Sequence, residues 1–157
     1  MKNILVTFSN FDRSCPEAVR RLEEYGFSVK CSQSSIPYYT YEQYCEEIEE
    51  VDAIIAGLDT LDERIFSKAY RLKIVSLMGI GYDRIDLEAA KRHGIKVTTT
   101  RGVNATAVAE HTIAMIISVY RNITQLDLAM HRGEWVRNMG RELSGKTVGL
   151  VGFGAIA

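Results

Sequence analysis

The chain has 157 residues, of which 46% are hydrophobic and 25% are charged, and this composition is typical of a globular protein rather than a disordered one. Its formal net charge of -1 at pH 7 argues against a nucleic acid or an anionic membrane as a partner recognised through bulk charge. The three cysteines are widely spaced and odd in number, which indicates neither a disulfide framework nor a metal site, so we expect a cytoplasmic protein with reduced thiols.

Short apolar segments alternate with helical segments through the first hundred residues. The expected strands, in chain order, are residues 3–8, 27–30, 51–57, 72–81 and 95–100. The expected helices are residues 16–26, a segment that ends near Glu50, residues 61–70 and residues 86–94. Strands that alternate with helices at this spacing form parallel sheets, so the pattern predicts an open α/β sandwich with helices on both faces.

Residues 104–123 are expected to form the longest helix. Its apolar residues occupy most of the circumference: Val108, Ile113, Met115, Ile116, Ile117, Val119 and Tyr120. Such a helix needs cover on nearly every side, but it is too short and too polar to span a bilayer. We therefore expect another subunit or the rest of a domain to cover it, most simply in a homodimer that associates through residues 106–121.

The last residues of the sequence, "VGLVGFGAIA", match the G-x-G-x-x-A form of the dinucleotide-binding fingerprint. Residues 146–151 would form the strand before the turn. The candidate cofactor-binding residues in the turn are Gly152, Gly154, Ala155, Ile156 and Ala157. Because no helix follows to fix the phosphate-binding amides, we expect half a cofactor site that binds no cofactor alone. The alternative is a glycine turn after a core strand.

Three segments together resemble the D-2-hydroxyacid dehydrogenase family. Residues 72–123 contain "GIGYDRID" and "VAEH", residues 132–135 are "RGEW", and residues 143–157 are "LSGKTVGLVGFGAIA". The resemblance implies an oxidoreductase that uses NAD or NADP and acts on the CH–OH group of a small D-2-hydroxy acid, or on the 2-keto acid in reverse.

The same resemblance implies two domains. Residues 1–100 would be a flavodoxin-like substrate-binding domain. Residues 101–157 would supply the linking helix and the first strand of a Rossmann domain.

The resemblance also assigns binding residues. The substrate would contact Met78, Gly79, Ile80, Gly81 and Asn104, and the nicotinamide would pack on Val108. Successive amides at a strand end can bind an anion, and glycine lets the backbone approach a ligand. The alternative is a tight strand-to-helix connection in which Asp86 caps the next helix, and Asn104 alone would be interpreted as a helix cap.

We expect no catalytic residue in this chain. The family's chemistry needs an Arg, a His and a carboxylate, and the resemblance places all three beyond Ala157, so the chain should fold without turnover. Glu110 and His111 are adjacent in one helix and point to different faces, which argues against a catalytic pair. Leu77 stands where relatives that take phosphorylated acids often have Arg, so a phosphorylated substrate is disfavoured.

The α/β pattern also allows a function other than catalysis. The alternative to an enzyme is a non-enzymatic flavodoxin-like ligand-binding or receiver module. Asp52 argues against a receiver, because it lies at the beginning of the third expected strand and not at its end. The tyrosines of the segment 38–44 are expected to anchor a partly buried loop, with a substrate mouth as the alternative.

Overall fold

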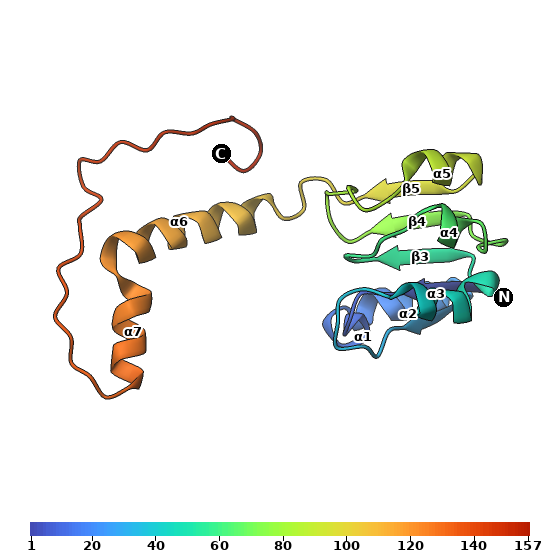
Figure 1. The fold of residues 1–157 in the computed structure, drawn as a ribbon, viewed down its shortest axis with the longest axis horizontal. Helices are drawn as coiled ribbons and strands as arrows, with labels where there is room; N and C mark the ends of the chain where they lie inside the picture. Colours follow the sequence, from blue (N-terminus) through green and yellow to red (C-terminus); the bar gives the residue numbers. More distant parts are fainter. The chain divides into compact units, whose positions relative to one another are not determined.

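The computed structural model describes residues 1–157, and its tertiary contacts form two units, Met1–Arg101 and Gly102–Ala157. The first unit is built on a parallel sheet with the strand order β2-β1-β3-β4-β5 (Figure 1). Its strands are β1 (Lys2–Val6), β2 (Phe27–Cys31), β3 (Ala53–Ala56), β4 (Ile74–Leu77) and β5 (Lys96–Thr99). This order is that of flavodoxin-like sheets, and it confirms the expected α/β fold class.

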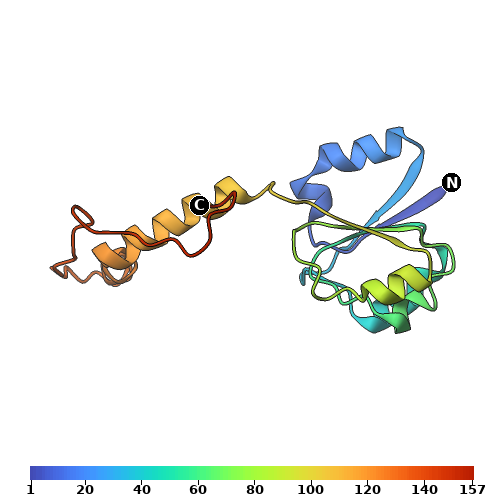
Figure 2. The same cartoon turned by 90° about the horizontal axis from the view of Figure 1, so that it is seen from above.

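Helices cover both faces of this sheet (Figure 2). One face carries α1 (Phe11–Ser14) and α2 (Pro16–Glu24), and the other carries α3 (Tyr41–Glu47), a 3-10 turn (Ile48–Glu50), α4 (Glu63–Phe66) and α5 (Leu87–Arg92). Successive strand residues point to opposite faces. In β1, Ile4 and Val6 therefore pack with the first helical layer, and Leu5 packs with the second.

Local side-chain caps begin three of the helices. Thr40 and Gln43 form a reciprocal capping box at α3, in which the Gln43 side chain accepts from the Thr40 amide at 2.8 Å. Asp62 accepts from the Arg64 amide at 3.0 Å at α4. Asp86 accepts from the Ala89 amide at 2.8 Å at α5, which is the cap that the alternative interpretation of the glycine turn included.

The second unit contains α6 (Ala105–Arg121) and α7 (Ile123–His131), joined by Asn122 in a left-handed conformation. The long helix was expected, whereas α7 was not. None of the residues of α6 is buried within the chain. No helix has the combined length and apolar character needed to cross a membrane.

Residues 134–157 form neither a helix nor a strand, so the expected strand at residues 146–151 is wrong for this structure. The physical reason is that a parallel strand must exchange backbone hydrogen bonds with a neighbouring strand. The sheet of the chain contains only β1 to β5, and no strand pairs with residues 146–151.

Candidate functional site

The carboxyl ends of the five parallel strands lie at one edge of the sheet, where open α/β sheets bind their ligands. Two features occur at this edge. One is a buried carboxylate, Asp59, which follows β3. The other is the glycine turn, which we define as residues 78–81 and which follows β4.

Asp59 is 2% exposed and accepts four hydrogen bonds. Its Oδ1 accepts from the Tyr39 amide at 2.7 Å and from the Tyr44 hydroxyl at 2.9 Å. Its Oδ2 accepts from the Thr7 hydroxyl at 2.6 Å and from the Gly57 amide at 2.9 Å. We call these five residues the Asp59 cluster. It fills the region between the ends of β1 and β3 with the chain's own side chains.

The environment of the cluster favours the protonated form of both buried tyrosines, of which Tyr44 donates through its hydroxyl and Tyr39 through its amide. The pKa of Tyr44 lies well above its ordinary value, because burial disfavours the phenolate and the nearby Asp59 carboxylate repels it. Burial likewise raises the pKa of Tyr39, and the two rings pack edge to face with their centroids 5.4 Å apart. Tyr39 and Tyr44 therefore anchor this segment as expected, whereas Tyr38 and Tyr41 of the same segment are exposed.

No exposed aspartate is positioned as a phosphate acceptor at the end of β3. Asp52 precedes the strand, accepts from the Asn3 amide at 2.8 Å and pairs with Arg71 at 2.9 Å. Asp59 follows the strand but is buried and fully hydrogen-bonded. This arrangement argues against the receiver alternative.

The glycine turn has three amides without an acceptor. The Met78 amide donates to the Ala56 carbonyl oxygen at 2.9 Å, so the sheet already uses it. The amides of Gly79, Ile80 and Gly81 donate to no atom of the chain. Of the four residues expected to bind an anion through their amides, the last three therefore have backbone N–H groups that are free to donate.

The chain itself gives no reason for glycine at position 79. Its φ lies outside the left-handed region, and a Cβ there would meet no atom within 4 Å. At Gly81 a Cβ would meet only the Asp83 Oδ2, at 3.2 Å. Glycine at these positions leaves open space over free amides, which suits the close approach of another molecule.

Thr100 fixes the turn through two hydrogen bonds, and exposed uncharged side chains lie in the turn and directly after it. The Gly79 carbonyl oxygen accepts from the Thr100 amide at 2.9 Å and from the Thr100 hydroxyl at 3.2 Å. The side chains of Met78, Ile80 and Tyr82 are exposed, at 39%, 53% and 47%. Leu77 directly precedes the turn, but its side chain is buried in the core at 3% exposure.

The predicted site residues of the second unit lie on exposed segments. Asn104 precedes α6, but its side chain makes no cap hydrogen bond. Val108 lies in the second turn of α6 and is 37% exposed. Glu110 and His111 are also exposed and make no hydrogen bond to each other.

Residues 152–157 do not form a pyrophosphate cradle in this structure. They lie in exposed turns, and the Ala157 amide donates to the Gly154 carbonyl oxygen at 3.1 Å. The fingerprint needs a strand before the turn and a helix after it to aim its amides, and neither element is present in these residues.

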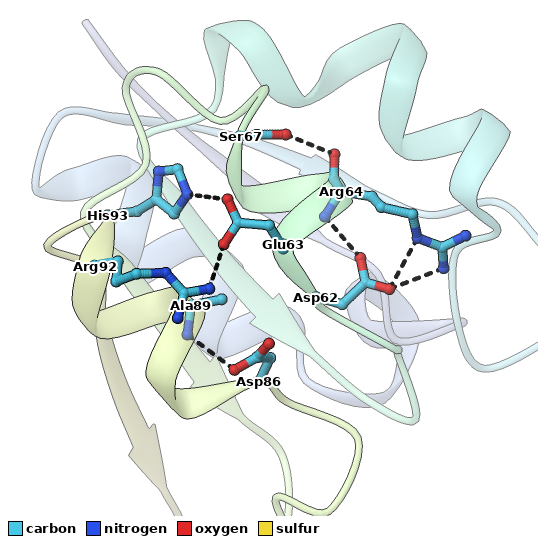
Figure 3. Close-up of polar contacts among 8 residues, drawn as sticks. All are labelled: Asp62, Glu63, Arg64, Ser67, Asp86, Ala89, Arg92 and His93. Carbon is cyan, nitrogen blue, oxygen red and sulfur yellow. Dashed lines mark hydrogen bonds and ion pairs between the residues drawn. The ribbon is translucent and has the colours of Figure 1, made fainter.

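A separate polar cluster joins α4 to α5 (Figure 3). Glu63 pairs with Arg92 at 2.6 Å and with His93 Nε2 at 2.8 Å. His93 and then Arg92 lower the pKa of the Glu63 carboxyl. Because His93 ends α5 just before β5 begins, this cluster lies at the amino edge of the sheet, opposite the glycine turn. It is a contact between helices.

The sheet order defines a flavodoxin-like α/β domain, and the turn after β4 leaves three backbone amides without an acceptor. A family model described as D-isomer specific 2-hydroxyacid dehydrogenase, catalytic domain, matches residues 5–151. The chain belongs to this family.

Relatives and solved structures agree with this assignment. Glyoxylate reductase of Pyrococcus furiosus is 38% identical over 144 residues, which cover 85% of this chain and 42% of that protein. D-3-phosphoglycerate dehydrogenase of Methanocaldococcus jannaschii is 36% identical, with coverage of 99% and 29%. The structure of NAD-dependent formate dehydrogenase from Staphylococcus aureus in complex with NAD is similar with a TM-score of 0.81 at 26% identity, with coverage of 99% and 50%. The chain thus spans half or less of these relatives.

Proposed function

We propose that residues 1–100 are the substrate-binding domain of an NAD- or NADP-dependent D-2-hydroxyacid dehydrogenase. The observation that carries this proposal is the set of free amides at Gly79, Ile80 and Gly81, which lie at the carboxyl edge of the sheet. Three free N–H donors in one turn suit the carboxylate that every 2-hydroxy and 2-keto acid carries. Membership of the D-2-hydroxyacid dehydrogenase family and the similarity to glyoxylate reductase support the reaction class.

The substrate we propose is a small 2-keto acid without a phosphate group, such as glyoxylate. The side chains within the turn, Met78 and Ile80, are uncharged, and the Asp83 carboxylate next to Gly81 disfavours a second anionic group. Arg84 is exposed, but its guanidinium donates to the Leu58 carbonyl oxygen at 3.2 Å. Thr100 positions the turn by holding the Gly79 carbonyl oxygen, so that the next amides remain free to donate.

Residues 101–157 are proposed to supply the linking helix and the first part of the dinucleotide-binding domain. Gly152, Gly154 and the residues to Ala157 would contact the pyrophosphate once a paired strand and a following helix fix their amides. Asn104 and Val108 would face the substrate and the nicotinamide. When bound, the cofactor supplies the hydride acceptor or donor. The Arg, the His and the carboxylate needed for proton transfer are proposed to lie outside these 157 residues.

Carboxylate binding tests the proposal directly. Titration of the isotopically labelled chain with glyoxylate should shift the amide resonances of Gly79, Ile80 and Gly81, and glycolaldehyde, which lacks the carboxylate, should not. Gly79→Ala should weaken the binding because its Cβ occupies the approach to the amides. Gly149→Ala is the matched control, since it also places a Cβ in open space. Shifts elsewhere in the chain, or equal affinity in both variants, would remove the basis of the proposal.

Turnover is a separate test. We expect the 157-residue chain to show none with a reduced nicotinamide cofactor and glyoxylate, hydroxypyruvate or pyruvate. Measurable oxidation of the cofactor would overturn the assignment of the proton-transfer residues to positions outside the chain, whereas the carboxylate site would stand.

The chain is also proposed to form a homodimer and to reside in the cytoplasm. Residues 106–121 are proposed to form a homodimer contact, because α6 exposes Ile113, Met115 and Val119. Light scattering over a range of protein concentrations should detect the dimer, and Ile113→Lys should shift it to monomer. A monomer at all concentrations would contradict the contact. A cytoplasmic location is proposed because all three cysteines are free thiols.

A further inference from the structure

A lysine and a cysteine from separate elements are in direct contact. Cys45 lies in α3, and Lys68 follows the end of α4. The Lys68 Nζ donates to the Cys45 Sγ at 3.2 Å, although 23 positions separate the two residues. One turn before Cys45, the ring of Tyr41 lies with its centroid 5.3 Å from the same Nζ. The sulfur and the ring together fix the end of the lysine side chain.

A thiol sulfur and an aromatic ring are unusual partners for a lysine near the surface. Lys68 is half-buried, and its pKa is raised first by the hydrogen bond to Cys45 and next by the hydrogen bond to Tyr41. No ion pair with a carboxylate holds it, in contrast to Lys30, which pairs with Glu47 at 2.8 Å. The contact between nitrogen and sulfur is therefore the principal polar interaction of this side chain.

We propose that Cys45 and Lys68 form a covalent sulfur–nitrogen bond when the protein meets a peroxide. In the first step the Cys45 sulfur attacks the peroxide, the O–O bond breaks, and the sulfur becomes a sulfenic acid while hydrogen peroxide is reduced to water. In the second step Lys68 loses a proton to solvent and its amine attacks the sulfur. The S–O bond breaks, and the leaving hydroxide takes the remaining excess proton from nitrogen to form water. A thiol, an amine and one hydrogen peroxide thus give one S–N bond and two waters.

The other two cysteines lack this arrangement and serve as internal controls. Cys15 and Cys31 pack against the core of the α1 and α2 layer, and neither accepts a hydrogen bond from a lysine or an arginine side chain. Burial, the largest cause, raises the pKa of Cys31, which disfavours the thiolate that reacts with peroxides. Oxidation should therefore select Cys45.

The bond would connect α3 to the segment after α4 and close the chain between residues 45 and 68. That closed segment contains β3 and Asp59. A cross-link restricts the unfolded chain, so oxidation should raise the melting temperature of the first unit. It would make the stability of the sheet's carboxyl edge depend on the redox conditions.

The experiment treats the 157-residue chain with stoichiometric hydrogen peroxide and measures the intact mass and the peptide map. The expected product is lighter than the reduced chain by two hydrogen atoms, contains one linked pair between Cys45 and Lys68, and returns to the starting mass with dithiothreitol. Cys45→Ser should form no link. A link that involves another lysine, or one that retains the peroxide oxygen, would overturn the proposed chemistry.

Lys68→Arg separates the two steps. Arginine keeps a cation beside the sulfur but stays protonated, so it cannot attack as an amine. This variant should stop at the sulfenic acid, which dimedone traps at Cys45 and not at Cys15 or Cys31. Lys91→Arg, at an exposed lysine in α5, should cross-link like the unmodified chain. Unlinked sulfenic acid in the unmodified chain, or equal oxidation of all three cysteines, would refute the proposal.

Discussion

Removing the Asp59 carboxylate should cause a large loss of stability in the first unit. The Asp59→Ala variant leaves the amides of Tyr39 and Gly57 without their acceptor, and backbone donors cannot turn away. The Thr7 hydroxyl can instead use the Ile55 carbonyl oxygen, which lies 3.4 Å away. The buried Tyr44 hydroxyl also loses its acceptor, so three stranded donors at about 1–3 kcal/mol each predict a loss of about 3–9 kcal/mol in the free energy of unfolding.

Asp59→Asn should cost less, about 1–3 kcal/mol, because one side-chain oxygen remains and only one of the two backbone amides faces the new NH₂ group. Urea unfolding followed by circular dichroism measures both variants, with an unchanged dependence on denaturant expected. Asp83→Asn, at an exposed position, is the control and should change the free energy by less than about 0.5 kcal/mol. A loss below about 1 kcal/mol in Asp59→Ala would refute the assigned role of the cluster.

Two further predictions concern acid stability and steric fit. His93 is the main cause of the lowered pKa of Glu63. The pairing therefore stabilises the fold at pH values above the pKa that Glu63 has in the unfolded chain. This stabilisation is lost as the pH falls through the lower pKa that Glu63 has in the folded chain. Glu63→Gln should therefore flatten the fall in melting temperature below about pH 5, and an unchanged acid profile would contradict the pairing. Gly57→Ala should lower the free energy of unfolding by about 1–3 kcal/mol, because its Cβ would lie 2.8 Å from the Pro37 carbonyl oxygen. Gly79→Ala should not lower it, and equal losses in the two variants would disprove the steric explanation.

Local patterns predicted most elements of the first unit. Each expected strand overlaps an observed one, because alternating or continuous runs of apolar residues mark the segments that are buried when the chain folds. Local residues also predicted the ends of two helices. Gly26 and Gly94 follow α2 and α5 with φ values of 81° and 68°, a backbone conformation that favours glycine. The sequence also contains a pattern that could have predicted α7, since the apolar residues Ile123, Leu126 and Met130 recur at helical spacing.

The strand at residues 146–151 shows the limit of such patterns. An apolar run indicates a capacity to form a strand, but the strand exists only when neighbouring backbone groups accept and donate its hydrogen bonds. No strand of the chain pairs with that segment.

The sequence by itself determined the alternation of strands and helices and the place of the glycine turn after the fourth strand, because both depend on residues adjacent in the chain. Only the tertiary structure decided the strand order, the burial of Asp59 and the contact of Cys45 with Lys68. Asp59 meets Tyr44 and Thr7 across 15 and 52 positions, and Cys45 meets Lys68 across 23. Contacts at such separations arise from how the layers pack, and no local spacing encodes them.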